Sequence, residues 1–285
     1  MTDRPSRHGR ARITGVPASS AVLDHDERHR WAQHFGVADA QIDHDFVISH
    51  LLVAVSEHAD KVVFYGGTAL SRTILPDLRL SEDVDLLSVG ARRDVAGALD
   101  QAVRDYLEPR FGEVTADPWL AGAVRDTQAC VFHVGDVDVK IQLIDGRSYT
   151  DWPIQESQIE QRYTAVPEVV LRTYTPRAFV GAKTSAWAET TRNAPRDLYD
   201  LWALARDGRI DAEAARLFKK YGPTGGYPEP GLLPSNPPTE EQWLAALEHQ
   251  CIPQVSAAEA FTFVTTAWSD AVGTARAPTW TNRIS

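Results

Sequence analysis

Residues 62–90 constrain the fold of this chain more than any other segment. They read VVFYGGTALSRTILPDLRLSEDVDLLSVG. VVFY is an apolar run of strand length, a glycine pair interrupts it, and the residues leading to Pro76 can form a short helix. A second apolar run, VDLLSV, is long enough for another strand. The segment therefore predicts a strand, a tight turn, a helix and a neighbouring strand.

The flanking segments predict an α+β fold. Helical periodicity in residues 42–59 and 94–111 alternates with strand-like runs, and ACVFHV and VDVKIQLI flank Gly135-Asp136, which suits a two-residue hairpin loop. Beyond Pro176, helical patterns follow one another, each ended by a break. We expect a mobile polar tail over residues 1–17, a mixed α/β subdomain over 18–175 and a helical subdomain over 176–285.

Composition limits the classes of function. No run reaches the about 18 apolar residues of a membrane helix, and the polar first thirty residues lack the apolar centre of a signal peptide, so we expect a cytoplasmic protein without a membrane partner. Cys130 and Cys251 lie far apart outside any metal-binding spacing and are expected to be buried. A net charge of -10 excludes a globally basic nucleic-acid binder, so any RNA contact requires a local basic surface.

The glycine pair and the two nearby aspartates together indicate a nucleotide site. In a strand, Asp83 and Asp85 project from one face, where two carboxylates are costly unless they share a cation such as Mg²⁺ or Mn²⁺. Gly66 and Gly67 allow a phosphate to approach the backbone amides of the following helix. Alone, a glycine pair is usually a turn and an Asp-x-Asp is usually surface charge; at two neighbouring strand ends they favour a bound nucleoside triphosphate with metal.

Several residues beside this pair are candidates for the same site. Thr68 and Ser71 can add hydroxyl donors, and Ser81 shares a strand face with Asp83. Arg72 and Arg79 flank the site and can meet phosphates, although surface arginines are common.

Four stretches, in order, resemble the AbiEii/AbiGii nucleotidyltransferase toxins of the DNA polymerase β-like superfamily. YGGTALSR at 65–72 is similar to the glycine motif of that family, and RLSEDVDLL at 79–87 to its Arg-x-Ser-x-Asp-x-Asp motif. Lys183 in GAKTSAW matches its helical lysine, and RDLYDL at 196–201 resembles its Arg-Asp-x-x-Asp-Leu motif. The resemblance covers about residues 44–207 and implies a nucleotidyltransferase-like mixed sheet with a helical subdomain after it.

The resemblance also implies an activity and its partners. It implies the toxin of a bacterial toxin-antitoxin or phage-defence pair, which transfers a nucleotide from an NTP to RNA, foremost the 3′ acceptor end of tRNA, and blocks translation. A cognate antitoxin would be a partner. Carried over by residue, Asp83 and Asp85 hold Mg²⁺, the Gly66–Thr68 turn cradles the triphosphate, Lys183 pairs with its phosphates and Asp200 completes the site.

The helix containing PRDLYDLWALA leaves two interpretations open. Arg196 and Asp200 are one turn apart, so Asp200 can face a cleft while Asp197 pairs with a neighbour or caps the helix, and Arg196 is a candidate nucleotide contact. An Arg196–Asp200 salt bridge joining two subdomains is the structural alternative.

One position departs from the superfamily pattern. The neighbouring strand, VDVKIQLI, places Gln142 where a third carboxylate is expected, so either Asp138 supplies the third metal ligand or Asp200 does. If neither Asp138 nor Asp200 takes this position, no side chain is in place to deprotonate the attacking hydroxyl. His133, opposite Asp138 in the hairpin, is interpreted as a paired strand residue.

Two other functions stay open alongside transfer to RNA. One is nucleotide transfer to a protein hydroxyl, which the acidic charge favours; the other is NTP binding without turnover, which Gln142 favours. Trp187 and Trp202 are interpreted as core residues rather than base-stacking ones. An RNA acceptor would need the basic residues of the second half: Arg172, Arg177, Lys183, Arg192, Arg196, Lys219 and Lys220.

Overall fold

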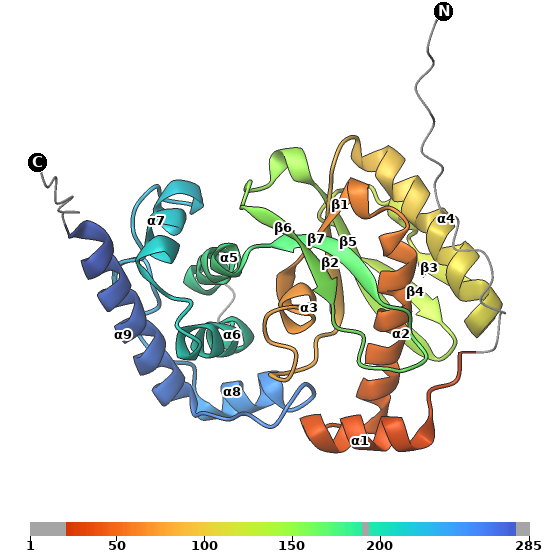
Figure 1. The fold of residues 1–285 in the computed structure, drawn as a ribbon, viewed down its shortest axis with the longest axis horizontal. Helices are drawn as coiled ribbons and strands as arrows, with labels where there is room; N and C mark the ends of the chain where they lie inside the picture. Colours follow the sequence, from red (N-terminus) through yellow and green to blue (C-terminus); the bar gives the residue numbers. More distant parts are fainter. Residues whose placement is uncertain (1–20, 190–193, 278–285) are drawn as a thin grey trace, which may run out of the picture.

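A mixed seven-stranded sheet forms the centre of the fold. The computed structural model describes residues 21–189 and 194–277, so the predicted tail and Arg192 lie outside the described residues. The strand order is β3-β4-β5-β2-β1-β7-β6 (Figure 1). The strands are β1 (Val62–Tyr65), β2 (Asp83–Ser88), β3 (Val114–Asp117), β4 (Cys130–Val134), β5 (Val137–Asp145), β6 (Ile154–Ile159) and β7 (Val169–Tyr174).

The two strands predicted from residues 62–90 lie side by side at the centre of the sheet. β1 is antiparallel to β2 and parallel to β7, while β2 is parallel to β5. All four residues of β1 are buried, which explains its unbroken apolar run. The hairpin between β4 and β5 is also confirmed, since Val134 pairs with Val137 and Gly135 takes a φ of 60° in the loop.

Helices cover the sheet on both sides (Figure 1). α2 (Asp39–Ser56) packs on β5, β7 and α4 (Arg92–Phe111), and α1 (His25–Phe35) packs on α2. The short α3 (Gly66–Ser71) follows β1 directly and contacts β1, β2 and α5 (Pro176–Ala188). α3 therefore lies between the centre of the sheet and α5.

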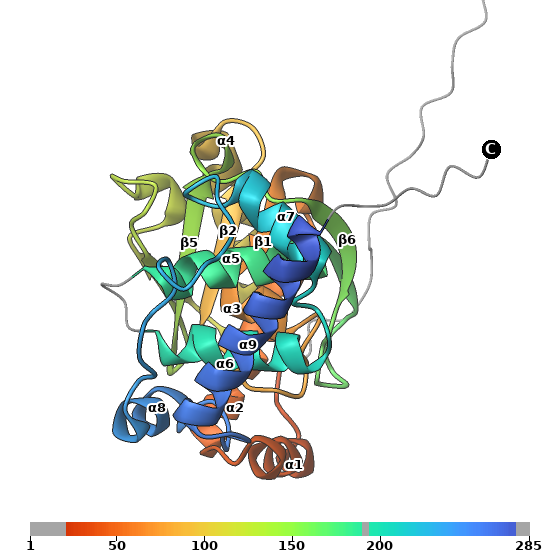
Figure 2. The same cartoon turned by 90° about the vertical axis from the view of Figure 1, so that its left-hand side faces the viewer.

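Beyond β7, the described part of the chain forms helices joined by loops and contributes no strand to the sheet. Its helices are α5 (Pro176–Ala188), α6 (Pro195–Arg206), α7 (Ala212–Tyr221), α8 (Glu240–Leu247) and α9 (Ala257–Arg276). α5 packs against α6 and α7, and α9 runs across α6 and packs on α7 (Figure 2). The predicted α+β fold, a mixed sheet followed by helices, is confirmed.

Side chains that the sequence assigned to the core lie there. Trp187 and Trp202 are buried among the helices, and Cys130 and Cys251 are buried free thiols. Along the described parts of the chain, no helix combines the length and the apolar character needed to cross a bilayer.

Candidate active site

A cavity of about 610 Å³ opens where the sheet meets α5 and α6. Three parts of the chain line it: the turn from β1 into α3, the strands β2 and β5, and the facing sides of α5 and α6. Among the sequence-predicted residues, the lining includes Gly66, Gly67, Ser81, Asp83, Asp85, Gln142, Lys183 and Arg196. Segments that are distant in sequence thus contribute to one polar cleft.

The glycine turn forms part of the cleft wall, and a side chain would be excluded at Gly66 and crowded at Gly67. Gly66 has a φ of 80°, and a Cβ there would collide with the Asp85 carboxylate. A Cβ on Gly67 would lie 3.0 Å from Nη2 of Arg79 and 3.2 Å from Oγ of Ser81. The backbone at the start of α3 is therefore open to a ligand and close to two polar side chains.

Gly66→Ala is expected to lower kcat for nucleotidyl transfer by about 10²-fold, because the new methyl group must displace the Asp85 carboxylate. The strained φ also costs stability, by about 1 kcal/mol. Gly90→Ala is the matched control, since Gly90 has a φ of 100° with no atom within 4 Å of its Cβ position. Steady-state kinetics and urea unfolding of both variants separate the two effects; equal kcat values in them would contradict the prediction.

Asp83 and Asp85 share a strand face, as their spacing predicts. Both are partly exposed, whereas Val84 and Leu86 between and after them are fully buried. Asp85 pairs with Gln142 of β5 in register, and Asp83 pairs with Lys140. Within residues 21–189 and 194–277, no three acidic, histidine or cysteine side chains cluster as a metal site. Two carboxylates nevertheless suit Mg²⁺, which commonly takes one or two from protein and completes its shell with phosphate oxygens and water.

Lys183 lies between two aspartates of α6. Its Nζ is 2.7 Å from Oδ1 of Asp197 and 2.7 Å from Oδ2 of Asp200. Burial alone would lower the pKa of Lys183, but the two carboxylates raise it above its usual value, so the side chain is a cation. Lys183 reaches the cleft beside Gly67 with its charge fixed in place.

Asp200 does not face the cleft, in contrast to the sequence interpretation. It is 1% exposed and accepts two hydrogen bonds of 2.7 Å from Nε and Nη2 of Arg79. Burial would raise the pKa of Asp200, yet Arg79 and Lys183 hold it below the usual range. Asp197 pairs with a neighbour, Lys183, as one of the two expected roles had it, and it also lines the cleft. The bidentate Arg79–Asp200 pair ties the segment before β2 to α6.

The ion-pair partner of Arg196 is not Asp200, in contrast to the structural alternative. Its Nη1 lies 3.4 Å from Oε2 of Glu82, so the predicted Arg196–Asp200 bridge is replaced by Arg79–Asp200 and Arg196–Glu82. Arg196 is half exposed at the cleft wall, where it can meet an anionic ligand.

Three further candidates lie beside the cleft rather than in its lining. The Thr68 hydroxyl packs 2.9 Å from Oγ of Ser81 and against the Asp83 carbonyl, so it joins α3 to the segment before β2. Ser71 donates to the Thr68 carbonyl and is buried. Oδ1 of Asp138 is 2.6 Å from Nδ1 of His133, its cross-strand partner. The structure does not bring Asp138 or Ser71 into the cleft, because strand pairing and helix packing direct them elsewhere.

Most of the proposed basic residues that the structure describes are engaged in local contacts. Arg177 pairs with Asp211, Arg172 donates to the Ala59 carbonyl, and Lys183 is buried between aspartates. Lys219 and Lys220 each lie over a tyrosine ring. Local cations, rather than a track along the helices, are therefore available to an anionic partner.

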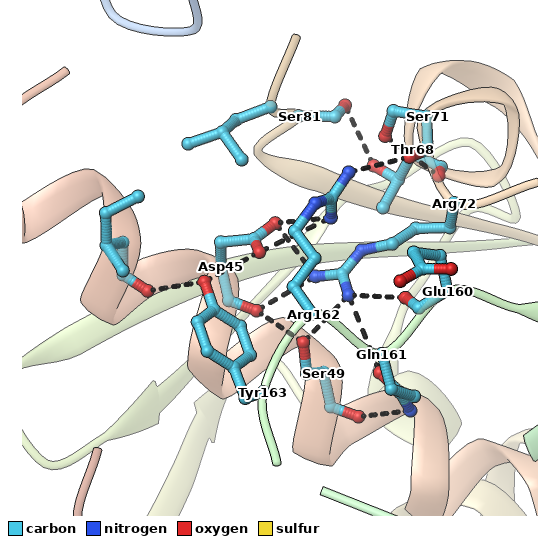
Figure 3. A network of polar contacts seen from close by, with 12 residues as sticks. Asp45, Ser49, Thr68, Ser71, Arg72, Ser81, Glu160, Gln161, Arg162 and Tyr163 are labelled. Carbon is cyan, nitrogen blue, oxygen red and sulfur yellow. Dashed lines mark hydrogen bonds and ion pairs between the residues drawn. The ribbon is translucent and has the colours of Figure 1, made fainter. Parts of the chain in front are cut away.

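A buried charge network behind α3 was not anticipated from the sequence (Figure 3). Nη2 of Arg72 donates to Oδ1 of Asp45 at 2.8 Å, and Arg162 donates to the carbonyls of Ser71 and Pro76. Tyr163 donates to Oδ2 of Asp45. The network ties the end of α3 to α2 and so fixes the helix whose first turn forms the cleft wall. Asp45 follows Asp43 and His44 in the sequence, so the sequence pattern did not mark it as a buried carboxylate.

One protein-family model matches most of the chain. The family model described as "Nucleotidyl transferase AbiEii toxin, Type IV TA system" matches residues 50–267. The chain belongs to this family. It is therefore a nucleotidyltransferase toxin of a toxin-antitoxin system, which uses an NTP as substrate and has an antitoxin as partner, and enzymes of this class use divalent metal ions.

The chain is also similar to a solved structure, at low sequence identity. MenT4, a nucleotidyltransferase toxin from Mycobacterium tuberculosis H37Rv, is similar at 18% identity and a TM-score of 0.48, over 88% of this chain and 99% of that one. No curated protein matches this AbiEii-family chain significantly.

Proposed function

We propose that this AbiEii-family toxin transfers a nucleotidyl group from an NTP to the 3′-hydroxyl of an RNA, with tRNA as the foremost acceptor, and uses Mg²⁺ or alternatively Mn²⁺. Blocking the acceptor end of tRNA would stop translation and could serve phage defence. The observation that supports it is the convergence of the glycine turn, Asp83 with Asp85, and Lys183 on one cleft.

Each group at the cleft has a part in this reaction. Asp83 and Asp85 would hold the metal ion, which when bound polarises the α-phosphate and assists ionisation of the attacking hydroxyl. The Gly66–Gly67 backbone leaves room for the triphosphate, and Lys183 and Arg79 supply positive charge beside it. The 3′-oxygen bonds to the α-phosphorus, the bond to the bridging oxygen breaks, pyrophosphate leaves and the hydroxyl proton passes to water.

Lys183 has to exchange partners for this role. Its contact with Asp197 at the cleft wall can be replaced by a phosphate oxygen, whereas Asp200 behind it keeps its hydrogen bonds to Arg79. Asp200 is therefore a positioning residue for Lys183 and Arg79.

The test is labelling with each of the four α-³²P nucleoside triphosphates in the presence of Mg²⁺, total tRNA and bulk protein. We expect label on tRNA with at least one nucleotide, and its loss in the Asp83→Ala variant. Repeating the assay with Mn²⁺ and with EDTA assigns the metal. Triphosphate binding without any label would overturn the proposal and leave a binding protein.

A protein hydroxyl is the second candidate acceptor. The net charge of -10 favours it, because such a surface repels RNA outside local cationic sites. The same assay distinguishes it, since label would then appear on protein rather than tRNA.

A further inference from the structure

Arg79 at the nucleotide cleft is held mostly by hydrogen bonds to the helical half of the chain. It lines the cleft but is only 3% exposed. Its Nε and Nη2 donate to the two oxygens of Asp200 on α6, at 2.7 Å each. Its Nη1 donates to the Leu80 carbonyl at 2.9 Å and to Oε1 of Gln250 at 2.7 Å. Gln250 lies between α8 and α9, 171 positions from Arg79 along the chain.

These contacts leave the guanidinium of Arg79 with one donor for a ligand. A guanidinium has five N–H donors, and hydrogen bonds to Asp200, Leu80 and Gln250 use four of them. Within the described part of the chain, the donor that remains is on Nη2. This nitrogen lies 3.0 Å from the position that a Cβ on Gly67 would take. The remaining N–H of Arg79 therefore belongs to the nitrogen beside the glycine turn.

The side-chain amide of Gln250 is fixed at both of its ends. Its Oε1 accepts from Arg79, and its Nε2 donates to Oε2 of Glu82 at 3.2 Å. The backbone carbonyl of Gln250 also accepts from the Leu80 N–H, at 2.9 Å. Glu82 pairs in turn with Arg196, the other arginine that lines the cleft. Gln250 thus connects the cleft arginines through hydrogen bonds to the segment before β2.

The chemistry of this position requires an amide. Gln250 is 1% exposed, so its polar atoms depend on protein partners rather than on water. An amide combines an acceptor for Arg79 with a donor for Glu82, whereas an ionised carboxylate only accepts and an ammonium only donates. The loss of the Gln250 acceptor would leave a buried N–H of Arg79 unsatisfied, which favours a shift of the guanidinium toward other acceptors.

We propose that Gln250 is a positioning residue of the nucleotide site. It accepts one N–H of Nη1 and so holds the Arg79 guanidinium in the orientation that presents the last donor, on Nη2, to the triphosphate. The assignment rests on the proposed function, in which Arg79 lies beside the triphosphate. It adds to the site a residue from the segment between α8 and α9, which lies beyond the glycine turn, the strand aspartates and α6.

The test measures the binding of each of the four NTPs, with Mg²⁺ and without an acceptor, to wild-type protein, Gln250→Met and Gln254→Met. Methionine keeps the length of glutamine but has neither its donor nor its carbonyl acceptor. Gln254 is the matched control, because its Oε1 also accepts from an arginine, Arg206 at 3.1 Å, at an exposed place in the same segment. Gln250→Met is expected to raise the Kd for NTP about tenfold, because Arg79 loses its fixed orientation. Gln254→Met should keep the wild-type Kd.

A double-mutant cycle shows whether the effect passes through Arg79. In an Arg79→Lys background, the ammonium keeps a positive charge beside Asp200 but has no Nη1 for Gln250 to hold. Adding Gln250→Met to Arg79→Lys should therefore change the Kd for NTP by less than about twofold. Urea unfolding gives the folded fraction of each variant, to which the Kd values are referred.

The outcomes separate the positioning role from the nucleotide site itself. If wild-type protein binds an NTP and Gln250→Met binds it as tightly as Gln254→Met does, the positioning role is overturned and the nucleotide site stands. An equal rise of the Kd with Arg79 and with Lys at this position would also overturn it, since the effect would then be a general loosening of the fold. If wild-type protein binds none of the four NTPs, the proposed function fails, and the role of Gln250 with it.

Discussion

Asp85→Asn is expected to lower kcat for nucleotidyl transfer by about 10³-fold, because the cleft loses one of the two strand carboxylates proposed to hold the divalent cation. Asparagine keeps the size of the side chain beside Gly66 but removes its charge. Asp85 is partly exposed, so the fold should tolerate the change. Single-turnover labelling with saturating NTP and RNA measures the effect on the chemical step.

Asp60→Asn is the matched control for this substitution. Asp60 is exposed in the short helix before β1, whereas Asp85 pairs with Tyr65 at the other end of that strand. The control should keep wild-type kcat, and both variants should keep the wild-type circular dichroism spectrum. An Asp85→Asn enzyme with more than a tenth of wild-type kcat would remove Asp85 from the metal site.

The parts of the site that were predictable depend on local sequence periodicity. Alternation in a strand places Asp83 and Asp85 on one face whatever lies around them, and a glycine pair after an apolar run indicates a special backbone. The Gly135-Asp136 hairpin is local in the same sense, because its register follows from the two-residue loop. These features needed no knowledge of tertiary packing.

The parts that were not predictable depend on contacts between distant residues. Arg79 and Asp200 are 121 positions apart, and Arg162 and Asp45 are 117 apart, so no spacing rule connects them. Both Asp197 and Asp200 are buried on α6, and only its packing against α5 decides which one reaches the cleft. Sequence periodicity gives the faces of a helix but not which face meets which partner.

The strand β6 was not predicted from the sequence, for a related reason. β6 reads IQESQI and is mostly exposed at the edge of the sheet, so it carries little of the apolar alternation that identifies a strand. It is held instead by antiparallel pairing with β7, from Ile154 with Tyr174 to Ile159 with Val169.

Asp200→Asn is expected to lower the free energy of unfolding by about 3–5 kcal/mol, because it leaves the buried Arg79 guanidinium without its counter-charge. Lys183 keeps Asp197 as a partner. The NTP KM should rise as well, since Arg79 and Lys183 would lose their fixed positions beside the cleft. Urea unfolding at constant pH measures the stability change, and NTP titration measures the KM.

The pKa shifts of Asp200 and Lys183 determine how the stability difference between wild type and Asp200→Asn depends on pH. The pKa of Asp200 is depressed, so its contribution is present above the unfolded value of about 4 and is lost as pH falls through the folded value. The pKa of Lys183 is raised, so its contribution is present below the unfolded value of about 10.4 and is lost as pH rises through the folded one. Wild type and Asp200→Asn should therefore differ by a constant amount between about pH 5 and 9 and converge in acid.

Two further variants show whether the unpaired charge of Arg79 causes the loss of stability in Asp200→Asn. Asp207→Asn removes an exposed carboxylate next to Arg206 at the end of the same helix and should change stability little. The double variant Arg79→Met/Asp200→Leu removes both charges together and should recover a large part of the stability lost in Asp200→Asn, because apolar side chains of similar size can replace a buried pair. If the double variant is instead less stable than Asp200→Asn, the Arg79–Asp200 hydrogen bonds themselves, rather than the cost of a lone buried cation, hold the segment before β2 against α6.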